Sequence, residues 1–447
     1  MNKLLQQVGI RDESFELLKV SDLIKRKVIE KPLDGNHGEI HPKGDDFVAS
    51  GVPFVMASDI KDGRINYSSC KYITTKQADS LRKGFAKNGD VLLTHKATIG
   101  RTALVDYEKH PFIMLTPQVT YYRIVDTEKL DSRYLMYYFN SSLFQQTLNL
   151  WAGSGSTRAY LGITAQHNLP VILPPITKQR KIAAVLSAYD DLIENNKFRI
   201  VALEKIAEEI YREWFVRFRF PGYQTAEFEK GVPKGWNLER VDSIGKVVTG
   251  KTPSTDNSKF YGGDIHFVKT PDMHGQTFIH RTEEALSLQG LESQPSQIIP
   301  ANSICVSCIG TGGVVSITTQ TCSTNQQINS VIPANSSDLY WAFSTLRSLK
   351  PTILAFGATG ATMTNLSKGK FAGLKVLAPP KELRKNFSET LEPTYEQIKV
   401  LCNSINILQQ QKDLLLPRLI SGKLSVDELD IQFPPSMQDE AEAELTK

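Results

Sequence analysis

The chain has 447 residues, of which 40% are hydrophobic, so it can bury more than one core, and no apolar run approaches the roughly 18 residues of a membrane span. A net charge of +4 permits nucleic-acid binding without indicating it, and five scattered cysteines argue against a disulfide framework. The start of the chain lacks the long apolar region of a secretory signal. We therefore expect a cytoplasmic protein that is not associated with a membrane.

The chain repeats itself. Residues 155–216 align with residues 360–421 without a gap, and upstream segments align with small shifts in offset, so that Gln118 pairs with Gln327. A period of about 200 residues indicates two duplicated domains, because solenoids repeat every 20–50 residues. Short β-rich runs broken by Gly, Pro and Asn predict a mixed α/β domain in each copy; they are residues 91–94, 119–125, 265–268 and 304–307.

A long heptad pattern follows each copy, from Ile182 to Trp214 and from Phe387 to Leu419. A helix over the first range would be roughly 50 Å long. Each helix offers one apolar stripe, which predicts an antiparallel coiled coil with Asn196 as a polar residue that sets register. The predicted seam consists of Ile182, Leu186, Ile193, Asn196, Ile200, Leu203, Ile210, Leu391, Ile398, Leu401, Ile405, Leu408 and Leu415.

The alternative for this stripe is that one face packs within the chain while further apolar residues, such as Phe215 and Phe218, await a partner. With either packing, the pattern predicts a pseudo-twofold molecule of two homologous globular domains separated by two long helices. The expected parts are a first globular domain (1–175), a central long helix (176–220), a second globular domain (221–380), a C-terminal long helix (381–425) and a frayed acidic tail (426–447).

Two local patterns invite a chemical interpretation. Residues 245–252 match the phosphate-loop pattern G-x4-G-K-S/T, but Pro253 follows at once where a helix should begin. Cys305 and Cys308 form at most half of a metal site, because no second pair follows at zinc-finger spacing. Nuclease and methyltransferase signatures are absent from the sequence. We therefore expect no catalytic residue, no metal site and no cofactor in this chain.

Matched loops rich in small polar residues are the stronger candidates for function. Residues 153–160 and 357–365 correspond to each other, as do 95–101 and 308–313, and their hydroxyl, amide and cationic groups suit contact with DNA phosphates and bases. The alternative is that these are ordinary glycine turns between strands. The candidate DNA-binding residues are Lys96, Thr98, Arg101, Ser154, Ser156, Thr157 and Arg158 in the first copy, and Thr311, Thr359, Thr362, Thr364 and Asn365 in the second.

Taken together, these features resemble the specificity subunit of type I restriction-modification enzymes over essentially the whole chain. The matching segments, of which none is specific alone, are residues 89–94, 169–175, 179–182, 250–254, 261–265, 268–272 and 415–424. The first copy departs from the pattern, because it has no counterpart of the Pro-x-Gly-Trp opening at residues 233–236, which leaves its start and residues 30–50 less defined.

The resemblance implies that each globular domain is a target-recognition domain that reads one half of a bipartite double-stranded DNA target. It implies that the helices set the spacer and dock two modification subunits, which methylate adenine, and that restriction subunits supply ATP-driven translocation and cleavage. S-adenosylmethionine, ATP and Mg would then be bound by those partners. The competing hypotheses are a coiled-coil scaffold that does not read DNA and a P-loop NTPase.

Overall fold

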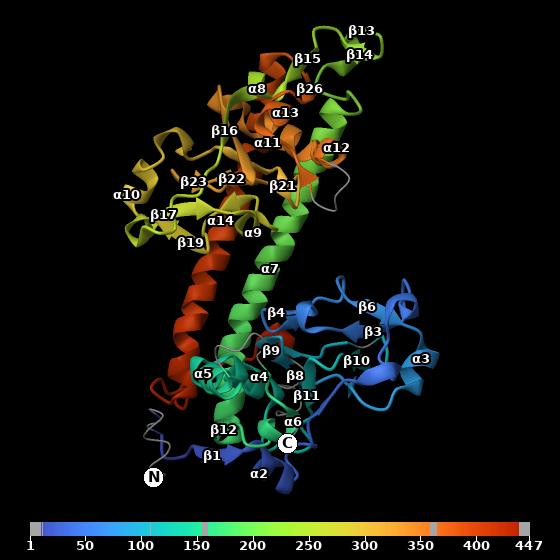
Figure 1. The fold of residues 1–447 in the computed structure, drawn as a ribbon, viewed down its shortest axis with the longest axis vertical. Coiled ribbons are helices and arrows are strands. Elements are labelled where there is room, and N and C mark those ends of the chain that lie inside the picture. Colours follow the sequence, from blue (N-terminus) through green and yellow to red (C-terminus); the bar gives the residue numbers. More distant parts are fainter. Residues whose placement is uncertain (1–9, 11, 108, 154–159, 358–363, 438–447) are drawn as a thin grey trace. The chain divides into compact units, whose positions relative to one another are not determined.

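The chain folds into two compact units joined by a pair of long helices (Figure 1). The computed structural model describes residues 10, 12–107, 109–153, 160–357 and 364–437. Unit 1 runs to Leu192 and resumes at Gln409, and unit 2 is Ile193–Leu408. Each unit contains part of α7 (Ile176–Phe215) and part of α14 (Lys381–Ile420), both 40 residues long. No helix in the described part of the chain has the length and apolarity of a membrane span.

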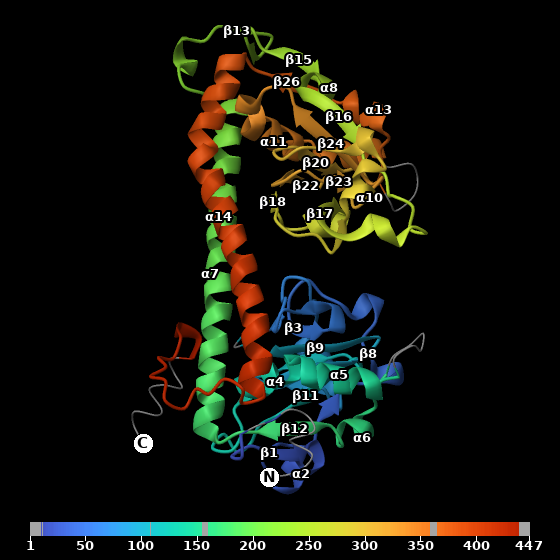
Figure 2. The same cartoon turned by 90° about the vertical axis from the view of Figure 1, so that its left-hand side faces the viewer.

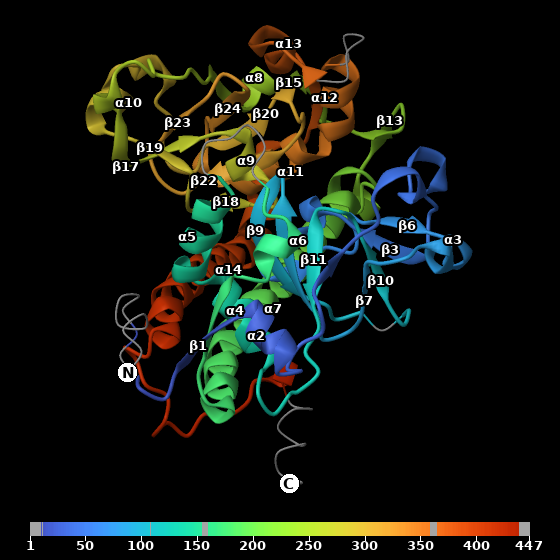
Figure 3. The ribbon, with the colours of Figure 1, turned by 60° about the horizontal axis from the view of Figure 1, so that its bottom comes forward.

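Unit 1 holds two four-stranded sheets, with strand orders β2-β11-β8-β9 and β6-β3-β10-β7, and two separate pairs, β1 with β12 and β4 with β5. Helix α3 packs through Ala78 on the β3–β6 side of the second sheet (Figure 3). The strands are β1 (Glu16–Lys19), β2 (Leu33–Asp34), β3 (Val52–Val55), β4 (Ile60–Lys61), β5 (Arg64–Ile65), β6 (Lys71–Ile73), β7 (Phe85–Ala86), β8 (Val91–Lys96), β9 (Thr98–Leu104), β10 (Ile113–Leu115), β11 (Val119–Tyr122) and β12 (Pro170–Leu173). The helices are α2 (Val20–Lys25), α3 (Thr75–Ser80), α4 (Ser132–Asn140), α5 (Ser142–Trp151) and α6 (Ile163–Gln166).

Unit 2 holds a five-stranded sheet of order β16-β24-β20-β22-β18, a three-stranded sheet of order β19-β17-β23, and three strand pairs. Its strands are β13 (Phe228–Glu229), β14 (Val232–Pro233), β15 (Asn237–Arg240), β16 (Gly245–Thr249), β17 (Tyr261–Val268), β18 (Phe278–Ile279), β19 (Glu284–Leu286), β20 (Ile304–Ser307), β21 (Ile309–Gly310), β22 (Val315–Thr318), β23 (Ser323–Thr324), β24 (Ile328–Pro333), β25 (Thr364–Asn365) and β26 (Lys375–Ala378). Its helices are α8 (Val241–Ile244), α9 (Thr270–Met273), α10 (Leu288–Glu292), α11 (Leu339–Ser348), α12 (Lys350–Gly357) and α13 (Lys368–Ala372).

The strand pairings confirm the internal repeat and the mixed α/β class. The order β2-β11-β8-β9 in unit 1 recurs as β16-β24-β20-β22 in unit 2, with antiparallel pairing throughout. In the second sheet of each unit, Phe54 pairs in parallel with Met114, and Phe267 pairs in parallel with Ser323. The same frame is therefore built twice from side chains that differ.

Local sequence explains where the core elements begin. The run Val91–His95 is buried at every residue, which fits a strand covered on both faces. Asp131 caps the N-terminus of helix α4, because its side chain accepts a hydrogen bond from the backbone N–H of Tyr134 at 2.7 Å. Ser141 caps helix α5 in the same way. Helix α14 ends at Ile420, and Gly422 then takes the left-handed conformation typical of a C-terminal cap.

Helices α7 and α14 lie side by side in each unit (Figure 2). In unit 2, the amide of Asn196 donates to the hydroxyl of Ser404 at 3.2 Å, and the Phe215 ring packs on Phe387 with centroids 4.8 Å apart. As the residue number increases along α7, the number of the contacting residue in α14 decreases, so the two helices are antiparallel. Every residue of the predicted seam is buried or partly buried.

The apolar residues at the end of α7 have partners within unit 2. Phe215 is 7% exposed and contacts Phe387 and Trp236, while Phe218 packs edge-on against Trp236 at 5.3 Å between centroids. The alternative that these two residues await a separate partner is therefore wrong. The connector that leads from α7 into the second globular domain covers them.

Residues 426–437 also differ from the frayed tail expected there. Val426 and Met437 are each 1% exposed, and the ammonium of Lys181 donates to the carbonyls of Val426, Asp427 and Leu429. The acidic composition of this segment led to the prediction of a frayed tail, although a few apolar residues anchor it. The segment is therefore part of unit 1 as far as residue 437.

Lys412 and Asp190 form a half-buried ion pair between α14 and α7 in unit 1, with side chains 14% and 20% exposed. Tyr137 also donates to Asp190, at 2.7 Å. Because Lys412→Ala leaves a poorly solvated carboxylate without its cation, we expect the free energy of unfolding to fall by about 1–3 kcal/mol, measured by urea titration. Lys399→Ala, which removes an exposed pair with Glu396 on the same helix, should cost at most about 0.5 kcal/mol. Equal losses for both variants would contradict the role of Lys412 in pairing the helices.

Gly250 lies against the backbone of Thr324 and Asn325, where an added Cβ would clash with both carbonyl oxygens. We expect Gly250→Ala to lower the free energy of unfolding by roughly 1–3 kcal/mol, because backbone must move to admit the methyl group. Gly369→Ala is the matched control, since nothing lies within 4 Å of its added Cβ. That variant should be neutral or more stable by up to about 1 kcal/mol. A neutral Gly250→Ala would refute the close approach.

Candidate functional site

Four segments meet at one place in unit 1, and we call them site 1: residues 34–37, 95–96, 116–118 and 160–161. The N–H of His95 donates to the carbonyl of Gln118 at 2.9 Å, and the N–H of Leu161 donates to the carbonyl of His95 at 3.0 Å. Gly35 lies against the segment 116–118 on the other side of the site. Its N–H donates to the carbonyl of Thr116 at 3.3 Å, and an added Cβ would clash with the neighbouring backbone. Backbone hydrogen bonds therefore link the segments directly to one another.

The four corresponding segments meet in unit 2, and we call them site 2: residues 249–252, 308–309, 325–327 and 365–366. The N–H of Cys308 donates to the carbonyl of Gln327 at 2.8 Å, and the N–H of Leu366 donates to the carbonyl of Cys308 at 2.9 Å. Gly250 takes the place of Gly35. The pairing of Gln118 with Gln327 predicted from the sequence is thus confirmed by equal backbone roles.

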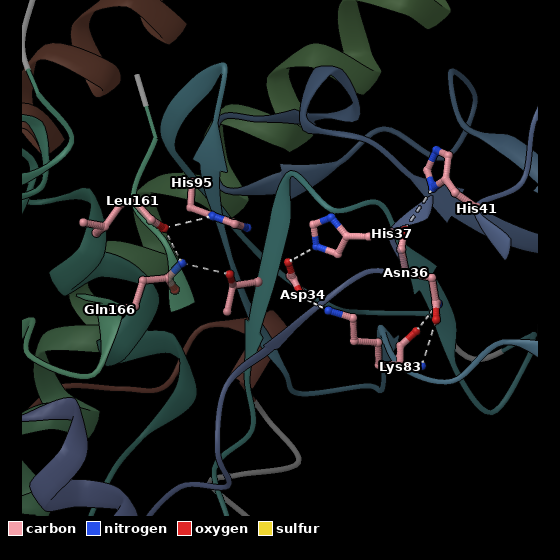
Figure 4. Close-up of polar contacts among 9 residues, drawn as sticks. Asp34, Asn36, His37, His41, Lys83, His95, Leu161 and Gln166 are labelled. Atoms are coloured by element: carbon pink, nitrogen blue, oxygen red, sulfur yellow. Dashed lines mark hydrogen bonds and ion pairs between the residues drawn. The ribbon is translucent and has the colours of Figure 1, made fainter. Parts of the chain in front are cut away.

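Asp34 organises the side chains of site 1 (Figure 4). Its buried carboxylate pairs with Nε2 of His37 at 2.7 Å and with the ammonium of Lys83. Burial acts to raise the pKa of Asp34, but the hydrogen bonds from Lys83 and His37 outweigh it, so the pKa lies below its usual value. Asp34 therefore stays ionised at neutral pH and fixes the side chains of both His37 and Lys83.

The side chain of His95, in site 1, is fully buried. Its Nδ1 is 3.0 Å from the carbonyl oxygen of Leu161, which can only accept, so Nδ1 carries the proton. Burial lowers the pKa of His95, which keeps the ring neutral. Its Nε2 has no hydrogen-bond partner among the described residues. The side chain of His95 thus links the end of β8 to Leu161, and its Nε2 is an acceptor without a hydrogen bond from the described residues.

Site 2 uses neutral hydrogen bonds where site 1 uses charges. Thr249 takes the place of Asp34 and donates to Oδ1 of Asn329 at 2.6 Å. Thr252 takes the place of His37 and donates to Oε1 of Gln326 at 2.8 Å. Lys251 is exposed beside them. The two sites share a backbone frame and differ in the groups that they present.

The structure brings together the two kinds of loop predicted from the sequence. Lys96 forms a β-bridge with Tyr160, and at the corresponding place Ile309 pairs with Asn365. Lys96, Thr311 and Asn365 are exposed, and Thr98 is partly exposed. The predicted residues Ser154, Ser156, Thr157, Arg158, Thr359 and Thr362 lie outside the described residues.

Two predicted residues make contacts within their own unit. Thr364 is 8% exposed, and its methyl group lies against Gly312 and Gly357, so it is not available to a ligand. Nη1 of Arg101 donates to the carbonyls of Ala57 and Ile60, at 3.2 and 3.3 Å. Arg101 thus braces a neighbouring turn in this structure.

The candidate DNA-binding residues drawn from the sequence did not include His37 or Thr252, although residues 250–254 were among the segments that carry the family resemblance. His37 and Thr252 each lie two residues after a glycine that must approach the neighbouring turn closely, Gly35 or Gly250. The recurrence of this glycine could have indicated the two positions from the sequence, but the loops that follow differ in sequence and length, so the correspondence is not evident there.

The phosphate-loop pattern does not form a phosphate site. Its first five residues are strand β16, and no helix follows Lys251 before the short turn at Ser258–Phe260. The N–H groups of Gly250 and Lys251 already donate to backbone carbonyls, at 3.1 and 2.9 Å. A P-loop NTPase is therefore not favoured, because that function needs these N–H groups for phosphate.

Cys305 and Cys308 are buried, and burial raises the pKa of their thiols to about 12 and about 11. They therefore stay protonated at neutral pH. Across the described residues, no three His, Cys, Asp or Glu side chains come close enough to hold a metal ion.

Known proteins resemble this chain in sequence and fold. The family model for the type I restriction modification DNA specificity domain matches residues 13–205 and 233–410. The HindI specificity subunit of Haemophilus influenzae is 29% identical over 437 residues, covering 83% of this chain and 94% of that protein. The MjaIX specificity subunit of Methanocaldococcus jannaschii is 27% identical, covering 85% and 88%.

A type I restriction-modification S subunit from M. genitalium shares the fold, with a TM-score of 0.51 at 13% identity over 92% of this chain and 96% of that one. The two matches of the family model fall on the two copies of the internal repeat and together cover most of the chain. The chain therefore belongs to the type I restriction modification DNA specificity family.

Proposed function

We propose that the chain is the noncatalytic DNA-specificity subunit of a type I restriction-modification complex, in which site 1 and site 2 each read one half of a bipartite target. The observation that carries the proposal is the pair of equal backbone frames with unequal polar side chains. Two different half-sites require equal support and different chemistry, and hydrogen-bonding side chains read base edges. Family membership and the names of the relatives support the same function.

The two long helices fit a further part of the proposal. Their antiparallel pairing supports a role in setting the spacer between the half-sites and in docking two modification subunits. Those subunits would bind S-adenosylmethionine and methylate adenine, and restriction subunits would use ATP and Mg. In this assembly the chain itself contributes recognition only, and it would act in the cytoplasm, where bacterial and archaeal DNA lies.

The proposal predicts a split methylation motif. The chain should be expressed with its modification subunit in a methylation-free host, and the host DNA sequenced with single-molecule detection of methyladenine. We expect an asymmetric motif of two short half-sites separated by unspecified bases, because two unlike sites read one DNA molecule. The modification subunit alone is the control and should give no such motif. Absence of methylation despite a stable complex would contradict the proposal.

The role of the helices predicts a change in spacer length. Removal of residues 193–199 from α7 and 401–407 from α14 deletes facing heptads, since Asn196 contacts Ser404, and shortens each helix by about 10 Å. We expect both half-sites to persist while the spacer shortens by roughly three base pairs, at 3.4 Å per base. The same methylation sequencing measures both.

The control for this deletion is Asn196→Leu, which alters the seam but keeps the helix length. Its motif should match that of the unmodified chain. An unchanged spacer after the double deletion, in a complex that still methylates DNA, would show that the helices do not set the spacing.

A further inference from the structure

One solvent-accessible polar side chain occupies the same place in each half, and neither of the two is among the candidate DNA-binding residues drawn from the sequence. His37 in site 1 lies two residues after Gly35, and Thr252 in site 2 lies two residues after Gly250. Site 1 presents His37 with half of its side chain exposed, and site 2 presents Thr252 partly exposed. Position and exposure are thus alike, while the chemical group differs.

Neighbouring groups hold both side chains in one orientation. His37 is fixed through Nε2 by Asp34, and Asp34 is fixed in turn by Lys83. The buried amide of Asn36 secures the intervening loop, because its oxygen accepts from the N–H groups of Arg82 and Lys83, at 3.0 and 3.2 Å. Thr252 is fixed by its donation to Gln326. Such support for an exposed side chain is typical of residues that must meet a ligand in a set geometry.

Each side chain keeps one acceptor for a ligand. The carboxylate of Asp34 can only accept, so Nε2 of His37 carries a proton, and in the tautomer that is protonated at Nε2 alone Nδ1 has a free lone pair. No described residue makes a hydrogen bond to Nδ1. The Thr252 hydroxyl uses its hydrogen on Gln326, which leaves its oxygen as an acceptor. Acceptors match the exocyclic amino groups of adenine and cytosine, whose position in the major groove distinguishes base pairs.

We propose that His37 and Thr252 are equivalent base-reading side chains, each of which accepts a hydrogen bond from the amino group of one base in its half-site. This inference rests on the proposed function and names the residues through which each site reads sequence. Asp34 and Gln326 are positioning residues, because they act through His37 and Thr252.

The test uses the full chain in complex with its modification subunits and measures methylation rates on DNA with both half-sites randomised. His37→Ala should reduce discrimination at one position of one half-site by roughly 5- to 150-fold and leave the other half-site unchanged. Thr252→Ala should do the same at one position of the other half-site. Asp34→Asn should weaken discrimination at the position that His37→Ala affects, because it loosens the same ring.

Matched controls are His110→Ala in unit 1 and Thr255→Ala in unit 2, which remove the same kinds of side chain at residues outside the two sites as defined above. Both should keep the complete motif. His37→Gln, which retains hydrogen-bonding capacity, guards against a folding defect and should keep methylation activity with altered preference at that one position.

An unchanged motif in both alanine variants would overturn the inference, and so would an equal loss of rate on every sequence, which indicates phosphate contact. Failure of the proposed function looks different, because the unmodified chain would then direct no methylation motif at all.

Discussion

Backbone hydrogen bonds between the end of a central strand and its two neighbouring segments hold each candidate site together. In unit 1 the main chain of His95 bonds to Gln118 on one side and Leu161 on the other, and in unit 2 Cys308 bonds to Gln327 and Leu366. Because these bonds use no side-chain atoms, almost any side chain can be presented on the same support. The only strict demand is glycine at the close approach, which both copies satisfy.

This independence accounts for the different chemistry of the two halves. Site 1 contains an ionised carboxylate with a histidine and a lysine, whereas site 2 uses threonine with amide side chains at the corresponding positions. A buried charge needs its partners, so the charges of site 1 form a connected set. Neutral hydrogen bonds impose a smaller requirement, and the bonds from Thr249 to Asn329 and from Thr252 to Gln326 share no residue. Recognition can thus change in one half without a compensating change in the frame.

Prediction from the sequence succeeded where one physical period or one repeated pattern dominated. The heptads gave helices α7 and α14, because apolar spacing determines which face of a helix is buried. Prediction failed where a few residues outweighed composition. Met437 anchors an acidic segment that was predicted to be frayed, and Phe215 packs on Trp236 from the connector after α7 as well as on Phe387. Burial of a single side chain depends on what lies opposite, which local sequence does not record.

By itself, the sequence determined that the chain is a duplication with two long helices and that its false phosphate loop lacks the helix it would need. Those conclusions follow from periodicity and from the backbone limits of proline and glycine, which are local properties. Only the tertiary structure decided which loops converge, that Arg101 braces a turn, and that His37 and Thr252 stand at equivalent places. Segments more than 60 residues apart, such as those of His95 and Leu161, meet through strand pairing, and the chain between them does not encode that distance.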